Sequence, residues 1–240
     1  MRVATFNLLG GRSTDAGFDV DRYTGAVREL DADLLALQEV DRDQERSAHL
    51  DLAALAAEAA GATAWRFEPT LVGPPGAWVK ASDGAGLRGG PAYGIAFVSR
   101  HPVTAWGVVH LPRLPGDEPR VAMVATVETP VGVWTVVSTH LTYLRPSCHL
   151  QLARLRLLVR RIGGPVLLLG DLNQGRATAE LLSGLRPLAT GATFPAHAPR
   201  LQLDHLLANR ELTTVSGGPL RLPVSDHLAL VADLAPDRAA

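Results

Sequence analysis

The sequence predicts one α/β domain that spans residues 1–240. Its 240 residues suit a single large domain, and 47% hydrophobic residues with a mean hydropathy of +0.11 fit a compact folded chain. Short apolar runs typical of strands alternate with segments of helical period. No linker, low-complexity tract or fixed-period repeat divides the chain.

The first quarter of the chain contains two expected strands and two expected helices. Residues 3–8 form the first strand, residues 21–30 a short helix, and residues 34–37 a second, buried strand. Residues 49–60 have an alanine-rich helical pattern. Gly61 should end that helix, because glycine readily adopts the left-handed conformation that closes helices.

The middle of the chain is rich in strand-forming residues. Residues 73–91 come first and give the longest loop signal, with two consecutive prolines and several glycines. Four β-rich runs follow, whose composition predicts antiparallel neighbours: residues 93–99, 103–110, 121–127 and 131–138.

The last third begins with the clearest helix, residues 148–162. Its apolar stripe consists of Cys148, Leu152, Leu155, Val159 and Ile162. Arg156, Arg160 and Arg161 are most simply a solvated face of this helix. The remaining elements are a strand at 166–169, a helix at 177–185, and strands at 203–207 and 228–231.

Composition excludes several classes of protein. A formal net charge of −1 provides no general attraction to nucleic acid or an anionic membrane, although a local patch could exist within it. Cys148 is the single cysteine, which excludes an internal disulfide and a multi-cysteine metal site. The chain opens on a strand and contains no transmembrane run, so we expect no signal peptide, no integral membrane segment and a cytoplasmic monomer.

Polar side chains follow six apolar strand-like runs. Taken singly, each could cap a turn or start a solvated loop, and a lone histidine is more often structural than catalytic. Together they are hard to explain as independent accidents, because strand ends gather on one rim of a sheet. These residues are Asn7, Gln38-Glu39, His140, Asp171 with Asn173, Asp204-His205 and Asp226-His227.

The chemistry of these residues indicates phosphoester hydrolysis. Carboxylate and amide oxygens without thiolates suit Mg²⁺ or Mn²⁺. Histidines that are not needed as ligands can donate protons or bind phosphate oxygens. Competing motifs fail: a G-x-G-x-x-G match at residues 84–89 leads into a strand, Lys80 is the sole lysine and lies in no P-loop, and no G-x-S-x-G occurs.

An ordered set of short motifs resembles the endonuclease/exonuclease/phosphatase superfamily, which has the deoxyribonuclease I-like fold. The resemblance runs over residues 3–230 and implies a four-layer α/β sandwich, with two packed mixed β-sheets flanked by helices. The motifs are Thr5-Phe6-Asn7, Leu37-Gln38-Glu39, residues 93–100, Ser138-Thr139-His140-Leu141, Gly170-Asp171-Leu172-Asn173, Leu203-Asp204-His205 and Ser225-Asp226-His227.

The resemblance also implies roles for the polar residues. Glu39 corresponds to the principal ligand of a Mg²⁺ or Mn²⁺ ion, with Asn7 and Asp226 beside it. These three residues are the predicted metal site.

The same resemblance implies the catalytic residues. Asp171 and Asn173 would position or activate the attacking water and contact the phosphate. His227 would lie at the scissile phosphate, oriented by Asp204, and His140 would stabilise the transition state.

The two Asp-His pairs are expected to differ. Side chains alternate along a strand, so Asp204 and His205 face opposite sides. We expect Asp204 to bond the ring of His227, and His205 to point away from the phosphate, into packing between Leu203 and Leu206.

Two departures from the family pattern bear on the substrate. Nucleases of abasic-site repair usually have an acid where this chain has Leu9, and an arginine where it has Leu203. The expected substrate-facing loops, residues 73–91, 111–120 and 141–147, hold few unopposed basic residues. We therefore expect a small or exposed phosphoester as substrate. The alternatives are a metal-dependent DNA or RNA endo- or exonuclease and, less favoured, a non-catalytic binding protein.

Overall fold

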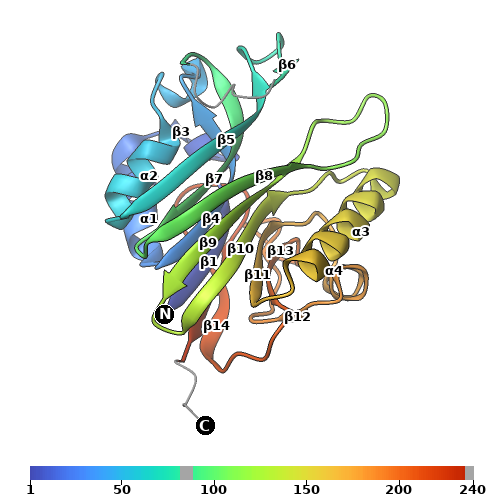
Figure 1. Ribbon diagram of the computed structural model, residues 1–240. Coiled ribbons are helices and arrows are strands. Elements are labelled where there is room, and N and C mark those ends of the chain that lie inside the picture. The colour runs from blue at the N-terminus through green and yellow to red at the C-terminus, as the bar shows by residue number, and fades with distance from the viewer. Residues whose placement is uncertain (82–88, 236–240) are drawn as a thin grey trace.

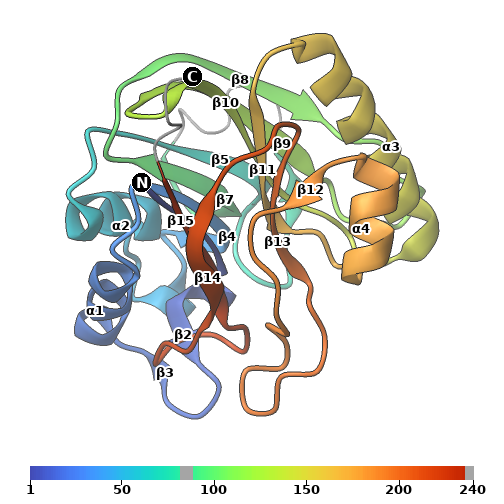
Figure 2. The ribbon, with the colours of Figure 1, turned by 90° about the horizontal axis from the view of Figure 1, so that it is seen from below.

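The computed structural model of the protein describes residues 1–81 and 89–235 (Figure 1). A seven-stranded mixed sheet packs against a six-stranded mixed sheet, and helices cover the outer face of each (Figures 1 and 2). The predicted four-layer α/β sandwich is therefore confirmed. Most of the rejected glycine motif at 84–89 lies outside the described residues.

The seven-stranded sheet forms around one parallel pair, and its other neighbours are antiparallel. In spatial order its strands are β14 (Thr214–Leu220), β15 (Ala229–Leu234), β1 (Arg2–Asn7), β4 (Leu34–Arg42), β7 (Ala92–Ser99), β5 (Ala64–Val72) and β6 (Val79–Lys80). The parallel pair is β1 with β4.

The six-stranded sheet also contains one parallel pair among antiparallel neighbours. Its order is β12 (Arg186–Pro187), β13 (Asp204–Ala208), β11 (Val166–Asp171), β10 (Gly132–His140), β9 (Val121–Thr129) and β8 (Val103–His110). Only β10 and β11 run parallel among these described strands. Outside both sheets lie a small ribbon of β2 (Arg12–Ser13) and β3 (Gly17–Phe18), and the 3₁₀ turns η1 (Leu9–Gly11) and η2 (Glu45–Ser47).

Four helices form the outer layers. Helices α1 (Val20–Leu30) and α2 (Leu52–Ala60) cover the seven-stranded sheet. Helices α3 (Arg145–Ile162) and α4 (Arg176–Ser183) cover the six-stranded sheet (Figure 2). Among the described residues, none of the helices combines the length and the apolar character that crossing a membrane requires.

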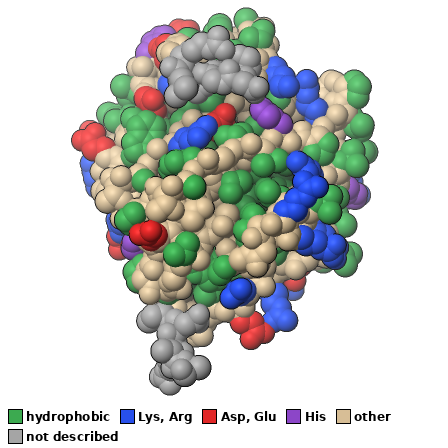
Figure 3. All heavy atoms as spheres, viewed as in Figure 1, with side chains coloured by type: hydrophobic (Ala, Val, Ile, Leu, Met, Phe, Trp, Pro, Cys, Tyr) green, Lys and Arg blue, Asp and Glu red, His purple; other side chains and the backbone are tan. Residues whose placement is uncertain are grey.

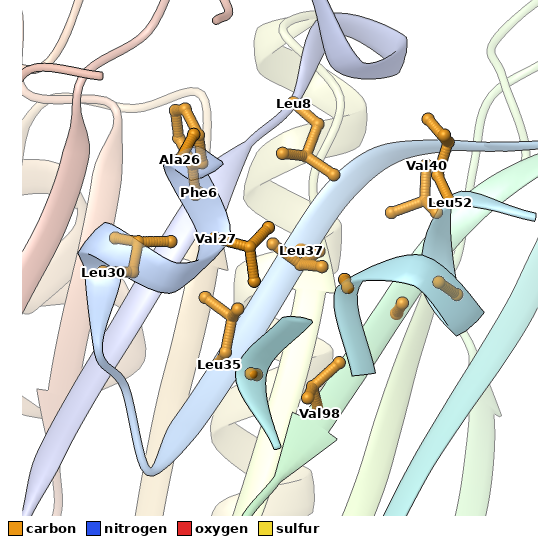
Figure 4. Close-up of a cluster of buried hydrophobic side chains, with 14 of the residues drawn as sticks. Phe6, Leu8, Ala26, Val27, Leu30, Leu35, Leu37, Val40, Leu52 and Val98 are labelled. Atoms are coloured by element: carbon orange, nitrogen blue, oxygen red, sulfur yellow. The ribbon is translucent and has the colours of Figure 1, made fainter. Parts of the chain in front are cut away.

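Three apolar clusters fill the three interfaces between the four layers. The first joins α1 and α2 to the sheet: Val27 lies beside Leu35 and Leu37, and Leu52 lies beside Val40 (Figure 4). The second lies between the two sheets, where Leu34 and other side chains of the first sheet meet those of the second. The third lies under α3 and α4. Burial of apolar area at each interface is the main stabilising contribution, at about 25 cal/mol per Å².

Two of the longer strands were not predicted from the sequence, besides the two-residue strands β2, β3, β6 and β12. Strand β5 contains Pro69, which argues against a strand, but the proline sits where the pairing register with β7 shifts. Strand β14 contains Gly217, Gly218 and Pro219, and it forms at an edge by pairing with β15. Tertiary pairing therefore overrides weak strand composition at both positions.

Two helices begin three residues away from the predicted start. Helix α2 begins at Leu52 and not at residue 49, because the Asp51 carboxylate caps it by accepting hydrogen bonds from Ala53 N and Ala54 N, at 3.1 and 3.0 Å. Helix α3 begins at Arg145, three residues before the predicted start, with Pro146 in its first turn.

Candidate active site

The register of three strands aligns three of the predicted site residues. His140 of β10 pairs with Asp171 of β11, and Asp171 pairs with Asp204 of β13. Because cross-strand partners share one face of a sheet, the three side chains project the same way. All three are buried. Three of the predicted site residues therefore lie together on this rim.

Gly170 of β11 allows the parallel strands β10 and β11 to lie close together. A Cβ atom at Gly170 would lie 2.0 Å from the backbone oxygen of Thr139, and its φ is +156°. We expect Gly170→Ala to cost about 3 kcal/mol of unfolding free energy, the upper part of the range for overpacking. Urea denaturation would measure the loss, with Gly164→Ala as the control because no atom lies within 4 Å of its built Cβ. An equal effect of both changes would contradict this account.

Asn7 joins the two sheets at the rim. Its Nδ2 donates to Glu39 Oε1 and to Asp171 Oδ2, each at 3.1 Å. Its Oδ1 accepts a hydrogen bond from Leu9 N at 3.2 Å. Asn7 and Glu39 come from the seven-stranded sheet and Asp171 from the six-stranded sheet. One amide therefore holds two carboxylates from separate layers close together.

Unusual backbone conformations aim two of these side chains. Glu39 lies where the pairing of β4 with β7 shifts between Leu37 and Val40, and its φ is 54°. Asn173 has a φ of 51°. Left-handed conformations of non-glycine residues cost about 1–3 kcal/mol and concentrate at functional sites. A regular strand would not place Glu39 at this position.

His227 and Asp204 form a buried pair. His227 Nδ1 donates to Asp204 Oδ2 at 2.8 Å, which leaves Nε2 facing Asp171 Oδ2 at 3.9 Å. The ring of Phe194 packs on His227 with centroids 4.8 Å apart. The predicted contact between Asp204 and His227 is thus confirmed.

Two of the buried groups in this cluster have raised pKa values. Burial lowers the pKa of His227, but the hydrogen bond that its ring donates to Asp204 and the charges of Asp204, Asp171 and Asp226 outweigh burial and raise that pKa to about 9. Burial, and then the charge of Asp204, raise the pKa of Asp171 to about 7. At neutral pH His227 is therefore an imidazolium beside a carboxyl group that exchanges its proton readily.

The pKa of His140, in contrast, is lowered. Burial lowers its pKa well below the ordinary value, and the positive charges of Arg120 and His227 lower it further. Its Nε2 lies 3.3 Å from Asn173 Nδ2 and 3.6 Å from Asp171 Oδ2. A neutral imidazole can accept a hydrogen bond from Asn173 Nδ2, which also donates to Leu141 O at 2.9 Å.

His205 is separate from this cluster. It is fully buried, and its Nε2 lies 2.9 Å from the backbone oxygen of Gln174. Burial lowers its pKa, so it is neutral. The expectation that His205 is a structural imidazole agrees with these contacts.

Asp226 holds a different position from the rest of the predicted metal set. Among the described residues, no hydrogen bond joins its carboxylate to Asn7 or Glu39, whereas its charge contributes to the raised pKa of His227. Ser225 Oγ donates to Asn7 O at 2.6 Å and ties this segment to the rim.

The donor set suits a hard divalent cation. Glu39 Oε1 and Asp171 Oδ2 lie on either side of one Asn7 amide group, and two facing carboxylates favour a cation between them. Ligand atoms of Asp171, Asp204 and His227 also lie within 4.8 Å of one another. Because Asp204 and His227 already bond each other, the oxygen set of Asn7, Glu39 and Asp171 is the better fit.

Sequence reasoning missed two neighbours of the site. Arg120, 7% exposed, directly precedes β9 on the same rim as His140, and its Nη2 donates to Glu118 Oε2 at 3.1 Å. The sequence pattern indicated only a basic residue in a substrate-facing loop, although its place before a strand was a usable signal. Phe194 lies in an irregular segment, and nothing in the sequence pattern marks it.

Comparison with known proteins identifies the family. The model of the Endonuclease/Exonuclease/phosphatase family matches residues 4–227, which include every residue of the cluster. The chain belongs to the endonuclease/exonuclease/phosphatase family. Members of this family are hydrolases that act on phosphoesters. A sequence search of curated proteins finds no match.

Several solved structures share the fold. An endonuclease/exonuclease/phosphatase from Beutenbergia cavernae is 26% identical with a TM-score of 0.75, over 98% of this chain and 71% of the other. A mannosyl-6-phosphatase from Bacteroides thetaiotaomicron is 15% identical with a TM-score of 0.70, over 98% and 99%. The catalytic domain of human Nocturnin is 21% identical with a TM-score of 0.68, over 98% and 94%.

Proposed function

We propose that this family member is a Mg²⁺- or Mn²⁺-dependent hydrolase that directs water at the phosphorus of a phosphoester. The observation that carries the proposal is that Asp171 belongs to two clusters at once. On one side Asn7 links it to Glu39, and on the other it faces the imidazole of His227. The Asp171 carboxylate therefore lies between residues that can bind a cation and a histidine that can transfer a proton.

Glu39, Asn7 and Asp171 would hold the cation, together with Asp226, whose charge also contributes to the raised pKa of His227. When bound, the cation would neutralise negative charge on the phosphate oxygens. Asn7 would turn its amide oxygen towards the ion, and its Nδ2 contacts with the two carboxylates would be lost. These four residues include the whole predicted metal set.

The proton transfers follow from the states of the remaining residues. Asp171 takes a proton from the attacking water as the oxygen bonds to phosphorus, and a carboxyl group with a raised pKa is suited to this at neutral pH. The bond from phosphorus to the leaving oxygen breaks, and the imidazolium of His227 donates its Nε2 proton to that oxygen. Asp204 keeps the other ring proton on Nδ1 and fixes the orientation of the ring.

His140 and Asn173 would complete the phosphate site. The neutral ring of His140 and the amide of Asn173 lie side by side, with 3.3 Å between His140 Nε2 and Asn173 Nδ2. When phosphate binds, the contact between the two side chains would be replaced: His140, protonated on Nε2, and Asn173 Nδ2 would each donate to a non-bridging oxygen, whose negative charge increases in the transition state.

The charge around the rim supports a small or exposed phosphoester as substrate. Arg120 is paired with Glu118 at 3.1 Å, and Arg113 Nη1 donates to Asp117 O at 2.6 Å. Arginines engaged in this way are poorly placed to track the phosphates of a duplex, which nucleases need.

A hydrolysis screen tests the proposal. Purified protein would be assayed with Mg²⁺ and Mn²⁺ against phosphomonoesters, phosphodiesters, phospholipids, and plasmid and abasic DNA. We expect turnover of a small or exposed ester and little cleavage of intact duplex. Preferred cleavage of plasmid DNA would favour the nuclease alternative, and inactivity on every substrate class would favour a binding protein.

Chelation should abolish the activity. Exhaustive dialysis against EDTA is expected to remove turnover, and added Mg²⁺ or Mn²⁺ to restore it, because carboxylate and amide oxygens form the site. Glu39→Gln should weaken Mn²⁺ binding in calorimetric titration and lower turnover together. Full activity after dialysis would contradict the metal-dependent mechanism, and unchanged Mn²⁺ affinity in Glu39→Gln would remove Glu39 from the ligand set.

A further inference from the structure

Helix α3 is strongly basic. Its 18 residues include five arginines and one histidine but no aspartate or glutamate, although the whole chain has a net charge of −1. Among the described residues, no ion pair joins Arg154, Arg156, Arg160 or Arg161 to an acidic group. Positive charge is thus concentrated on one helix and is not neutralised there.

Exposed leucines lie between these arginines. Leu150 is 48% exposed and Leu157 is 49% exposed. At 100° per residue, Leu150 and Leu157 project within about 20° of each other and form a stripe along the outer face of α3. Arg156 and Arg160 flank the stripe on one side, and Arg161 flanks it on the other. We call these five residues the α3 surface.

Large apolar side chains close to α3 are exposed as well. Leu181 of α4 is 74% exposed, and Tyr143 and Leu144, just before α3, are 71% and 40% exposed. In Figure 3, hydrophobic side chains (green) and Lys and Arg side chains (blue) lie next to each other on the side where Figure 1 places α3 and α4. Large apolar side chains exposed in a group mark an interaction surface more often than ones scattered singly.

Two hollows border α3, and both have basic side chains in their walls. The smaller, about 250 Å³, is lined by Arg156 and Arg160 together with Gly184. The larger, about 660 Å³, is lined by Arg145 and by Gln174, which directly follows the site residue Asn173. An anionic group can enter either hollow while the leucines contact an apolar phase.

We propose that the α3 surface docks the protein on an anionic membrane. Leucines flanked by arginines match the boundary between lipid headgroups and acyl chains, where apolar side chains insert and cations meet phosphate. A nucleic acid would satisfy the arginines but not Leu150 and Leu157, since bases stack on aromatic rings and not on leucine. The inference is independent of the proposed hydrolysis.

Vesicle sedimentation tests the proposal on the full chain in EDTA, where hydrolysis plays no part. We expect binding to vesicles that contain phosphatidylglycerol, a decrease at high salt, and little binding to pure phosphatidylcholine. Arg156→Gln with Arg160→Gln should weaken binding about 30-fold, from about 1 kcal/mol for each arginine. Leu150→Glu with Leu157→Glu should weaken it at least about tenfold, because the stripe can no longer insert.

Matched controls change exposed aliphatic residues and exposed arginines elsewhere. Val133→Glu with Val215→Glu alters two valines that are 57% and 71% exposed, and Arg210→Gln with Arg221→Gln removes two exposed arginines. Both pairs should bind vesicles like the wild type, and unchanged melting temperatures would show that all variants are folded. Absent binding, equal binding to both vesicle types, or equal losses in the control pairs would overturn the proposal. So would loss of DNA-oligonucleotide binding in the α3 variants while vesicle binding stays intact.

Discussion

Asp171→Asn is expected to lower turnover by about 10²- to 10⁴-fold, the usual contribution of a general base. The amide has almost the same shape as the carboxylate and sits in the same buried position, but it cannot accept the proton of the attacking water. Steady-state assay of the ester identified by the substrate screen would measure the loss. Asp15→Asn, an exposed carboxylate on a surface turn, is the matched control and should retain full turnover.

The same substitution should stabilise the metal-free protein at neutral pH. The pKa of Asp171 is about 7 in the folded chain against an ordinary 3.8, so its protonated form is favoured by folding. Stability from this group is fully present below about pH 4 and is lost as the pH rises through 7. In EDTA, the melting temperature of Asp171→Asn should therefore exceed that of the wild type at pH 8, and the difference should shrink towards pH 4.

In the turnover assay, a loss below tenfold for Asp171→Asn, with the fold intact, would exclude Asp171 as the base.

His227→Ala is expected to reduce turnover on a similar scale, about 10²- to 10⁴-fold, because it removes both the proton donor and the cation beside the phosphate. Asp204→Asn should act through His227, since the amide cannot hold the ring proton on Nδ1 as the carboxylate does. We therefore expect Asp204→Asn to lower turnover and to shift the pH profile to lower pH, because the pKa of His227 falls without its partner.

His205→Gln is the matched comparison on the same strand. His205 contacts Gln174 O in a buried site and faces no part of the catalytic cluster, so this change should lower the melting temperature more than it lowers turnover. Equal effects of Asp204→Asn and His205→Gln on turnover and on the pH profile would contradict the assigned roles.

Local sequence patterns are enough to find most of the site. An apolar run followed by a polar residue marks a strand end, and this pattern alone locates Asn7, His140 and Asp171. Alternation along one strand then separates Asp204 from His205. These properties depend on neighbouring residues only, so a single amino-acid sequence can reveal them.

Features that depend on tertiary packing are not predictable in the same way. That Asn7 bonds both Glu39 and Asp171 follows from the packing of one sheet on the other, which no local pattern encodes. The stacking of Phe194 on His227 arises in a segment without periodicity. Strands β5 and β14 form despite Pro69 and a pair of glycines, because partners in the sheet supply the hydrogen bonds.

Hydrolysis in H₂¹⁸O tests the central claim most directly, namely that water attacks phosphorus at the rim around Asp171. Mass spectrometry of both products would follow a single turnover of the best substrate with Mg²⁺ or Mn²⁺. We expect one ¹⁸O atom in the phosphate product and none in the released alcohol. In the time that the wild type takes for one turnover, Asp171→Asn should form at most about 1% as much labelled phosphate. Label in the alcohol, or full labelling by Asp171→Asn in the same time, would contradict this mechanism.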